Sequence, residues 1–421
     1  MNLRQLKTVT ERRKFFEKTR RVNLKHIGRY SLDDAGASAR NCENMIGATQ
    51  IPLGIAGPLA ISNIRSTKLR TGKNQISNKN TKPEEFHIPL ATTEGALVAS
   101  VNRGCKAIME SGGAHTDSYR VGATRGAVFH VSGLAQNDTL NTYIEEHFKE
   151  LQAIAGQTSK HLTLTRFFSR GLGRYRYVRF VFDTRDAMGM NMATIATTAV
   201  ATAIEKKTGI RCLSVAGNYD TDKKPSWLNA IEGRGWKAWA EVTIPATILR
   251  TVLKTTARDM YDVWIAKCMI GSALSGSMGF NAHYANVLAA LFIATGQDPA
   301  HVAEGSAGIT TAEVVRNQES GIRNQEESLY ISVYLPDLMI GTVGGGTGLE
   351  TQREALSILG VAGGNNGANV RTFAEIVGAA VLAGEASLLA SLAEGSLARA
   401  HQRLARGRVN PTNKQINTSD K

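Results

Sequence analysis

Cysteine is scarce in this chain of 421 residues. The four cysteines, Cys42, Cys105, Cys212 and Cys268, lie far apart in the sequence. Their spacing matches neither a disulfide framework nor the paired ligands of a metal site. We therefore predict a reducing compartment and no bound metal.

A long uninterrupted apolar run is also missing. The best window, residues 377–397, contains Glu385 and Glu394 and falls short of the about 18 apolar residues that a membrane-spanning helix needs. The N-terminus lacks the apolar core of a secretory signal, and its acidic Glu11 and Glu17 count against a mitochondrial presequence. These absences predict no membrane span in this chain and a cytoplasmic location.

Internal repeats and extended low-complexity tracts are absent as well. Hydrophobic residues at 42% and charged residues at 20% are typical of a globular protein, and the length predicts two or three folding units. The net charge of +14 implies attraction to nucleic acid, an anionic membrane surface or a phosphate-rich small molecule. Charge alone leaves these open, but we predict no nucleic acid partner, because the basic N-terminus shows no binding motif and no interleaved aromatic residues.

The first half of the chain contains one predicted loop and one predicted helix, and the helix starts at a possible catalytic residue. Residues 62–86 are rich in Asn, Lys, Ser and Thr without an apolar period, which predicts a long surface loop inserted in a hairpin. Apolar residues from Leu97 to Met109 recur at helical spacing, and Gly112-Gly113 ends the pattern. Glu94 is therefore predicted at the start of a helix.

A strand followed by a helix is predicted next. Val178, Phe180 and Phe182 stand on alternating positions within residues 176–183, which indicates a strand. The following helix is predicted to begin with Asp186 as a capping residue and to end near residue 207, before Gly209.

Two further long helices are predicted in the second half. Residues 260–295 are apolar but contain many Gly and Ser residues, so neighbouring backbones could approach closely. We predict that this segment is a buried central helix. Residues 372–406 form another predicted helix, followed by a polar, frayed tail.

Two motifs contain charged side chains that catalysis could use. Glu94 beside Gly95 is either a carboxylate favoured by a helix N-terminus or, in a closed apolar site, a proton donor. Asp222, Lys223 and Lys224 precede Pro225 in a predicted loop. These lysines are either solvated, or one ammonium faces a developing oxyanion while the other holds a substrate carboxylate.

Other motifs could bind a ligand through the backbone. The glycine-rich residues 341–348 are either a plain turn or a surface that a phosphate or flat ring can approach, although they are not the dinucleotide fingerprint. Residues 186–192 open a helix and could present N–H groups to an anion. Asp298 reads as a loop acid and His401 as a solvated histidine on a basic helix. No single motif is decisive.

Taken together, these motifs resemble the catalytic portion of class I 3-hydroxy-3-methylglutaryl-CoA (HMG-CoA) reductases across nearly the whole chain. The matching segments are Glu43-Asn-Met-Ile-Gly, Ile51-Pro-Leu-Gly-Ile-Ala-Gly-Pro-Leu, Ala91-Thr-Thr-Glu-Gly, Thr124-Arg-Gly, Asp186-Ala-Met-Gly-Met-Asn-Met, Asp222-Lys-Lys-Pro, Ile231-Glu-Gly-Arg-Gly, Asn281-Ala-His, Gly296-Gln-Asp and Gly341-Thr-Val-Gly-Gly-Gly-Thr.

The resemblance implies an α+β fold with a large, mostly helical dimerisation domain around a central helix and an inserted ferredoxin-like α/β cofactor domain. The implied parts are an N-terminal helical region (1–40), the large domain (41–126 and 215–408), the NADPH-binding insert (127–214) and a flexible tail (409–421). The active site would lie between subunits, so a homodimer or homotetramer is implied, with residues 43–47 near the contact.

The implied reaction is the NADPH-dependent four-electron reduction of HMG-CoA to mevalonate and CoA through mevaldehyde, a step of isoprenoid and sterol precursor synthesis. Lys223 would stabilise the thioester carbonyl oxygen, and Glu94 would donate a proton to the aldehyde. Asp298 would tune both groups, and His401 would protonate the departing CoA thiolate.

The resemblance also implies binding residues for each ligand. The hydroxymethylglutaryl group would be held by Arg125, Asp222, Lys224 and Lys267, with His283 and Asn286 close by. CoA would face Ser100, Asn102, Arg103 and Lys254. NADPH would contact Asp186, Met188, Gly189, Met190, Asn191, Gly344, Gly345, Gly346 and Thr347, with Ser159 and Lys160 near the adenosine phosphate.

The chain departs from the family pattern at several positions. Ala216 replaces a usual Ser that contacts the substrate, which removes a hydrogen bond worth about 0.5–1.5 kcal/mol. The segment 276–281 has lost one of two adjacent glycines. Val121, Ala123 and Lys160 replace the usual Asp, Met and Arg, and Gly407 replaces a phosphorylatable Ser.

These departures keep a second hypothesis open, a catalytically weakened homologue that binds CoA ligands. The retention of Glu94, Lys223, Asp298 and His401 favours an active enzyme. NAD-linked oxidation of mevalonate is disfavoured, because the methionine-rich motif and the triple-glycine turn resemble class I.

Overall fold

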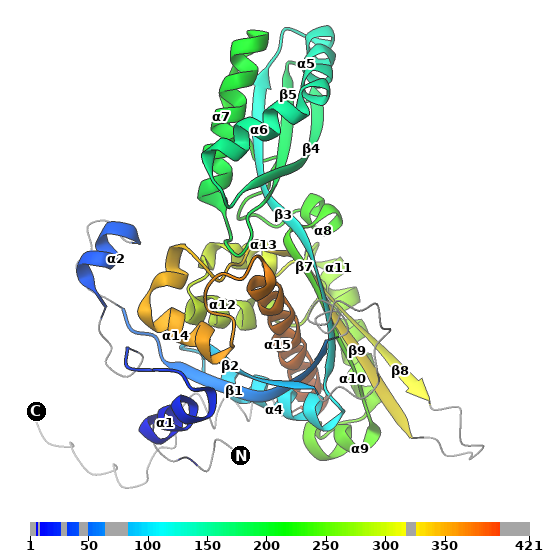
Figure 1. Ribbon diagram of the computed structural model, residues 1–421. Coiled ribbons are helices and arrows are strands. Elements are labelled where there is room, and N and C mark those ends of the chain that lie inside the picture. Colours follow the sequence, from blue (N-terminus) through cyan, green and yellow to red (C-terminus); the bar gives the residue numbers. More distant parts are fainter. Residues whose placement is uncertain are drawn as a thin grey trace, which may run out of the picture.

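The computed structural model describes residues 6, 9–26, 32–41, 49–63, 83–316 and 326–395. A smaller unit stands on a larger one, and the long strand β3 runs from one into the other (Figure 1). The strands are β1 (Leu53–Asn63), β2 (Glu84–Ala91), β3 (Ala114–His130), β4 (Thr163–Leu172), β5 (Tyr175–Asp183), β6 (Cys212–Ser214), β7 (Arg234–Ile244), β8 (Ile309–Arg316) and β9 (Glu327–Leu338).

The helices alternate with these strands along the chain. The α-helices are α1 (Val9–Arg20), α2 (Asp34–Arg40), α4 (Leu97–Glu110), α5 (Leu134–Glu146), α6 (Phe148–Thr158), α7 (Met190–Thr208), α8 (Trp227–Glu232), α9 (Ala246–Ile248), α10 (Ala257–Trp264), α11 (Ser272–Leu274), α12 (Tyr284–Thr295), α13 (Val302–Gly305), α14 (Glu350–Ile358) and α15 (Ala368–Ala393). Short π-helical segments are η2 (Leu249–Leu253) and η3 (Ile265–Gly271), and 3-10 turns are η4 (Pro299–His301) and η5 (Gly345–Gly348).

The larger unit is built on a mixed sheet with strand order β2-β1-β3-β7-β9-β8. β1 and β2 pair antiparallel, with Ile61 opposite Glu84, so the predicted hairpin is confirmed. Residues 64–82, most of the loop predicted inside it, lie outside the described residues. α4 begins at Leu97 and ends before Gly112 and Gly113, both with left-handed φ angles, as predicted.

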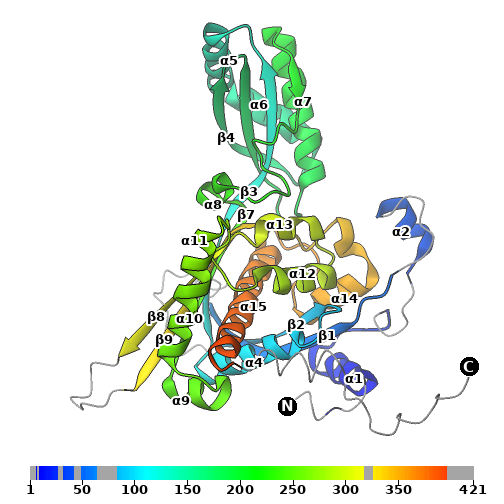
Figure 2. The ribbon, with the colours of Figure 1, turned by 180° about the vertical axis from the view of Figure 1, so that it is seen from behind.

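The helix at the centre of the larger unit is α15. It packs on β7, β3 and β9 and against α4, α10 and α12 (Figures 1 and 2). Among the described residues it is the one helix long and apolar enough to cross a membrane. Because 83% of its most apolar window is buried inside the protein, that is weak evidence for a membrane span.

The prediction of one buried central helix over residues 260–295 was wrong. The segment divides into α10, η3, α11 and α12, with an irregular stretch between Leu274 and Tyr284. Gly276 there adopts a left-handed φ of 67°, and Asn281 donates to the carbonyl oxygens of Ser306 and Gly308 instead of facing helical neighbours. Polar side chains that bond nearby backbone compete with helix formation, which the apolar periodicity did not reveal.

Asp186 caps α15 rather than α7, so the predicted role was wrong. Its buried carboxylate accepts from the backbone N–H groups of Asn365, Gly367 and Val370, at the N-terminus of α15. A carboxylate is favoured there by the helix dipole. α7 itself starts at Met190, after Gly189 in the left-handed conformation.

The smaller unit has a sheet in the order β4-β5-β3-β6 with α5, α6 and α7 on one face (Figure 1). The predicted strand over 176–183 is confirmed as β5, and α7 ends at Gly209 (φ 68°) as predicted. Helices and sheet enclose a separate hydrophobic core of residues from Ala127 to Ile210. This core falls inside residues 127–214, and their assignment as an inserted domain stays a prediction.

Candidate active site

Lys223 lies in a loop between β6 and α8 whose backbone is strained. Asn218, Thr221 and Lys223 all have positive φ angles, of 62°, 52° and 57°. Such angles cost non-glycine residues about 1 kcal/mol or more each and persist only where surrounding contacts impose them. Here Thr124 donates to the carbonyl oxygen of Asp220, and the Lys223 backbone N–H donates to Glu304. The loop therefore has a fixed shape that aims the Lys223 side chain.

The Lys223 side chain forms an ion pair with Asp298. Nζ of Lys223 lies 2.7 Å from Oδ2 of Asp298, and both side chains are partly exposed. Burial opposes ionisation of Asp298, but hydrogen bonds from Lys223 and the Ala300 N–H hold its pKa below the ordinary value. Two of the predicted catalytic groups are thus in direct contact as ammonium and carboxylate.

A buried guanidinium lies behind this pair. Arg234 is fully buried and bonds Asp222 (2.8 Å), Glu304 (2.9 Å) and the Thr124 hydroxyl (2.9 Å). Burial opposes ionisation of Asp222, but the charges of Arg234 and Arg125 outweigh it and hold the pKa of Asp222 low. Asp222 is therefore an anion whose orientation is fixed by two arginines.

Arg125 belongs to the same network. Its NH1 group lies 3.1 Å from Asp220 and 3.2 Å from Asp222, and its side chain is largely buried. Lys224, by contrast, is exposed and donates to Asn218 at 3.3 Å. Of the residues predicted to hold the hydroxymethylglutaryl group, the structure thus places Arg125, Asp222 and Lys224 beside Lys223.

Asp337 is a second buried acid next to Arg234. Its Oδ2 atom accepts from Nδ2 of Asn229 at 2.6 Å, and the residue is 1% exposed. Burial raises the pKa of Asp337 to about 8, even though the charges of Arg234 and Arg179 work against the rise. The acid is thus neutral at pH 7.

This acid makes stability depend on pH. From its ordinary pKa of 3.8 up to about 8, Asp337 is protonated in the folded chain and ionised in the unfolded chain. Unfolding then releases a proton, so stability falls as pH rises, by at most about 1.4 kcal/mol per pH unit. We expect Asp337→Asn to flatten the fall, measured by urea unfolding at several pH values between 4 and 8. Equal slopes for variant and wild type would contradict this.

The structure does not bring Glu94 together with Lys223, because Glu94 lies near the start of α12 and the Lys223–Asp298 pair lies beyond its end. Its carboxylate is exposed and accepts from Nδ2 of Asn286 at 3.4 Å, and its N–H donates to the Thr92 hydroxyl. His283 precedes α12 with its backbone N–H on Glu385, and its Nε2 is buried with no hydrogen-bond partner among the described residues. The structure therefore joins Glu94, Asn286 and His283 at the start of α12, and Asp298 follows the end of the same helix.

The glycine-rich turn is fastened to both the Asp186 loop and the segment before Asp298. Gln297 accepts from the Gly341 N–H and donates to the Gly341 carbonyl oxygen. A Cβ on Gly341 would overlap the backbone N of Met188, and one on Gly346 would lie 2.6 Å from the Gly296 carbonyl oxygen. Three motifs far apart in sequence thus meet beside the Lys223–Asp298 pair.

The surface of this turn is open to a ligand. Gly344, Gly345 and Gly348 have nothing within 4 Å of where a Cβ would stand. Beside the first turn of α7, the Ser159 hydroxyl contacts the sulfur of Met192 at 3.5 Å, next to exposed Lys160. The predicted cofactor residues thus lie at the start of α7 and in the turn. Asp186 differs, because its carboxylate is bonded to backbone N–H groups at the start of α15.

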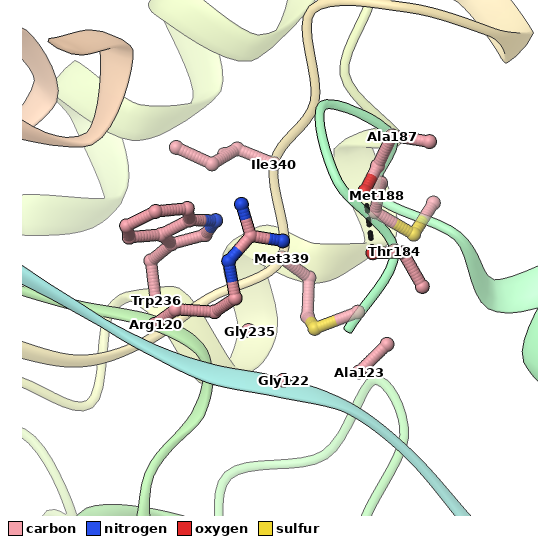
Figure 3. Close-up of a pocket in the computed structure, with 10 residues that line it drawn as sticks. All are labelled: Arg120, Gly122, Ala123, Thr184, Ala187, Met188, Gly235, Trp236, Met339 and Ile340. Atoms are coloured by element: carbon pink, nitrogen blue, oxygen red, sulfur yellow. Dashed lines mark hydrogen bonds between the residues drawn. The ribbon is translucent and has the colours of Figure 1, made fainter. Parts of the chain in front are cut away.

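A small pocket lies behind the Thr184–Met188 loop (Figure 3). Figure 3 shows Arg120 and Trp236 facing Met339 and Met188 across it, with the Thr184 hydroxyl donating to the Ala187 carbonyl oxygen. Of the predicted cofactor residues only Met188 lines this pocket.

Several of the residues predicted to face CoA form hydrogen bonds within the chain. Arg103 bonds Ser387 and Ser391 of α15, and Ser100 donates to the Ser387 hydroxyl. Asn102 accepts from the Gly57 N–H. Lys254 and Lys267 are exposed, and His401 and residues 43–47 lie outside the described residues.

Sequence reasoning missed the buried half of the network. Arg234, Glu304, His301, Asp220 and Asn229 connect the predicted residues but were assigned no role. Arg234 had a signal, since it stands between two glycines in a matched motif. The others carry no local pattern.

An ammonium paired with a carboxylate, backed by a buried arginine and bordered by glycine-lined turns, has the charge and the open backbone that suit an enzyme acting on an anionic substrate. Comparison with known proteins supports this. The family model for hydroxymethylglutaryl-coenzyme A reductase matches residues 8–406. The 3-hydroxy-3-methylglutaryl-coenzyme A reductase of Methanothermobacter thermautotrophicus is 47% identical over 397 residues, covering 94% of this chain and 93% of its own. That of Methanocaldococcus jannaschii is 48% identical over 407 residues, covering 95% and 93%.

A solved structure also shares the fold. The class II 3-hydroxy-3-methylglutaryl-CoA reductase of Streptococcus pneumoniae bound to NADPH matches with a TM-score of 0.70 and 18% identity, covering 93% of this chain and 99% of its own. At this identity the likeness shows the fold alone. With the family match over most of its length, the chain belongs to the hydroxymethylglutaryl-coenzyme A reductase family.

Proposed function

We propose that this protein reduces HMG-CoA to mevalonate and CoA in two NADPH-dependent steps through mevaldehyde. The observation that carries the proposal is the 2.7 Å pair of Lys223 and Asp298 on the segment that fastens the glycine-rich turn. It places an ammonium beside the surface that fits a cofactor. The family to which the chain belongs names the substrate.

Each catalytic role is proposed from the local chemistry. Lys223 donates hydrogen bonds to the thioester oxygen as it gains negative charge, because a fixed ammonium stabilises an oxyanion. Asp298 holds that ammonium in position through the 2.7 Å ion pair. Glu94, exposed beside Asn286, protonates the aldehyde oxygen, and His401 protonates the departing thiolate.

NADPH is the proposed cofactor, and when bound it supplies the hydride for each reduction. Gly344, Gly345, Gly346 and Thr347 hold one side of it, since the space beside Gly344 and Gly345 is open to a flat ring while Gly346 packs on Gly296 and fixes the turn. Met188 to Asn191 hold it from the start of α7, and Ser159 and Lys160 bind the adenosine phosphate.

Substrate binding is proposed to rest on the fixed charges around Lys223. Arg125 and Lys224 attract the substrate carboxylate, and Asp222 accepts from its hydroxyl. Ala216 is exposed and offers no hydroxyl, so affinity is expected to be lower than in relatives with Ser there.

We propose class I for this chain, on the methionine-rich motif and the triple-glycine turn. The streptococcal reductase that shares the fold is a class II enzyme, and this observation favours the other class. Steady-state rates with NADPH and with NADH test part of this proposal: a preference for NADH would contradict class I. A preference for NADPH would fit both classes, because the class II streptococcal enzyme is itself bound to NADPH.

A homodimer or homotetramer with shared active sites is part of the proposal, as is a cytoplasmic location. Co-expression of Lys223→Ala and His401→Gln chains tests the sharing. If each site takes residues from two subunits, mixed oligomers recover activity that neither parent has. No recovery in mixed oligomers would contradict shared sites.

The activity itself is tested by the loss of NADPH absorbance with HMG-CoA. The proposal expects about two NADPH consumed per HMG-CoA, because the thioester takes four electrons. A second reaction with mevalonate, CoA and NAD tests the oxidative direction. Protein inactive in both reactions would favour the weakened homologue that only binds CoA ligands.

The role of His401 predicts a difference between two substrates. His401→Gln should slow the reduction of HMG-CoA by about 100-fold or more, because the thiolate leaves unprotonated and returns to the aldehyde. Free mevaldehyde has no thiolate to release, so its reduction should change far less. Equal losses with both substrates would argue against this role.

A further inference from the structure

A buried histidine stands behind the Lys223–Asp298 pair. His301 follows Asp298 by three residues, in the 3-10 turn η4, and its side chain is fully buried. Nothing in the proposed chemistry uses it. A buried titratable ring this close to a catalytic carboxylate calls for a reason, because burial penalises its charged form.

Glu304 fixes the orientation of the ring. Nδ1 of His301 lies 2.6 Å from Oε1 of Glu304, which is itself buried. The same oxygen accepts from Arg234 at 2.9 Å and from the Lys223 backbone N–H at 3.2 Å. Since Oε1 is a carboxylate acceptor, Nδ1 carries the proton. The ring is therefore tied to the atom that also holds the backbone of Lys223.

The other ring nitrogen faces Asp298. Nε2 has no hydrogen-bond partner among the described residues and lies 3.9 Å from Oδ2 of Asp298. That distance is too long for a hydrogen bond, yet a shift of about 1 Å would make one. Oδ2 is also the atom bonded to Lys223. One carboxylate oxygen thus stands between the ammonium and the imidazole.

The remaining neighbours set the charge around the ring. Acceptor atoms of Asp222 and Glu304 lie within 4.8 Å of His301, but both carboxylates are bonded to Arg234, so that guanidinium is the cation of this cluster. Facing the ring are therefore the acids Asp222, Asp298 and Glu304 and the cations Lys223 and Arg234. A third cation, Arg125, is bonded to Asp222, so the ring lies among three carboxylates that each have a cationic partner.

We propose that His301 is a positioning residue that holds Asp298 in place while Lys223 engages the substrate. When the ammonium turns toward the thioester oxygen, Asp298 loses part of its partner. The Nε2–H of His301 then donates to Oδ2 and keeps the carboxylate ionised and oriented. The proton stays on Nε2, and no bond is made or broken. The inference rests on the proposed function and adds a residue to it.

A pair of variants separates positioning from structure. His301→Gln can present an amide N–H where Nε2 stood, whereas His301→Asn can reach Glu304 but not Asp298. We expect kcat to fall by about 100-fold in His301→Asn and by about tenfold in His301→Gln, with KM for HMG-CoA nearly unchanged. His130→Gln, at the far end of β3, is the matched control and should keep wild-type kcat.

The pH profile supplies a readout that a structural role would not move. Wild-type kcat should decline as pH rises and His301 loses its Nε2 proton. His301→Gln cannot lose that N–H, so the decline should vanish at the lower rate. Equal kcat in both variants, wild-type kcat in His301→Asn, or an unchanged decline in His301→Gln would overturn the proposal.

A measurement without turnover tests the contact independently. In protein labelled at its histidine rings, the NMR signal of His301 is the one missing from His301→Gln. Asp298→Asn should lower the pH at which that signal titrates, because the facing anion is removed. An unchanged titration would overturn the positioning role. Wild-type protein that titrates as expected but does not reduce HMG-CoA would overturn the proposed function instead.

Discussion

Replacing Lys223 by Ala is expected to lower kcat for HMG-CoA by about 1,000-fold, near the limit of detection. The ammonium is the one proposed donor to the thioester oxygen, and its loss leaves the developing negative charge unstabilised. Its backbone contacts to Glu304 remain, so the fold should persist. The variant is measured by NADPH absorbance at saturating substrate, with a thermal melt to show that the protein is folded.

Lys224→Ala is the matched comparison for this result. Lys224 is also exposed but bonds the neutral Asn218 instead of a carboxylate. Its loss should mainly raise KM for HMG-CoA, because it attracts the substrate carboxylate without touching the reacting oxygen. A Lys223→Ala enzyme within tenfold of wild-type kcat, or two variants with the same pattern, would contradict the assigned roles.

Motifs with a local period could be read from the sequence, and the structure confirms them. Alternation over Val178, Phe180 and Phe182 predicted β5, and Gly209 predicted the end of α7. Both signals depend on neighbouring residues only, through the strand pleat and the left-handed helix end. The same local signals also predicted the helix that follows Glu94.

Contacts between distant segments could not be read in this way. Asp186 looks like a cap for the helix that follows it, but its carboxylate caps α15, nearly two hundred residues further along. The composition of residues 260–295 predicted a central helix, whereas that place is taken by α15. Apolar content shows that a segment is buried, but does not show which of two buried segments lies at the centre.

The site shows the same division. Lys223 and Asp298 were predicted by resemblance, and the structure brings them together. The buried side of this pair is formed by Arg234, Glu304 and His301, which fix its position. They matter because they are charged or polar groups buried away from solvent. A buried charge needs partners of opposite charge, so the Arg234 guanidinium fixes the orientation of the acids bonded to it, Asp222 and Glu304. Such a requirement appears only when the segments are packed.

The close packing of α4 on α15 leads to the largest expected change in stability. Gly104 faces the backbone of Ala383, and a Cβ there would overlap the Ala383 carbonyl oxygen. Because the obstacle is helix backbone, it cannot turn aside as a side chain could. Gly104→Ala is therefore expected to lower the free energy of unfolding by about 3 kcal/mol or more, since overpacking forces the helices apart.

Urea unfolding followed by circular dichroism measures this change, and Gly156→Ala is its matched control. Gly156 also lies within a helix, α6, but has nothing within 4 Å of where a Cβ would stand. Alanine there should raise the free energy of unfolding by about 0.5–1 kcal/mol, because glycine loses more backbone freedom on folding. The two substitutions are chemically identical, so opposite signs would isolate the packing contact. A Gly104→Ala protein as stable as wild type would mean that α4 and α15 are not in backbone contact at Gly104 and Ala383.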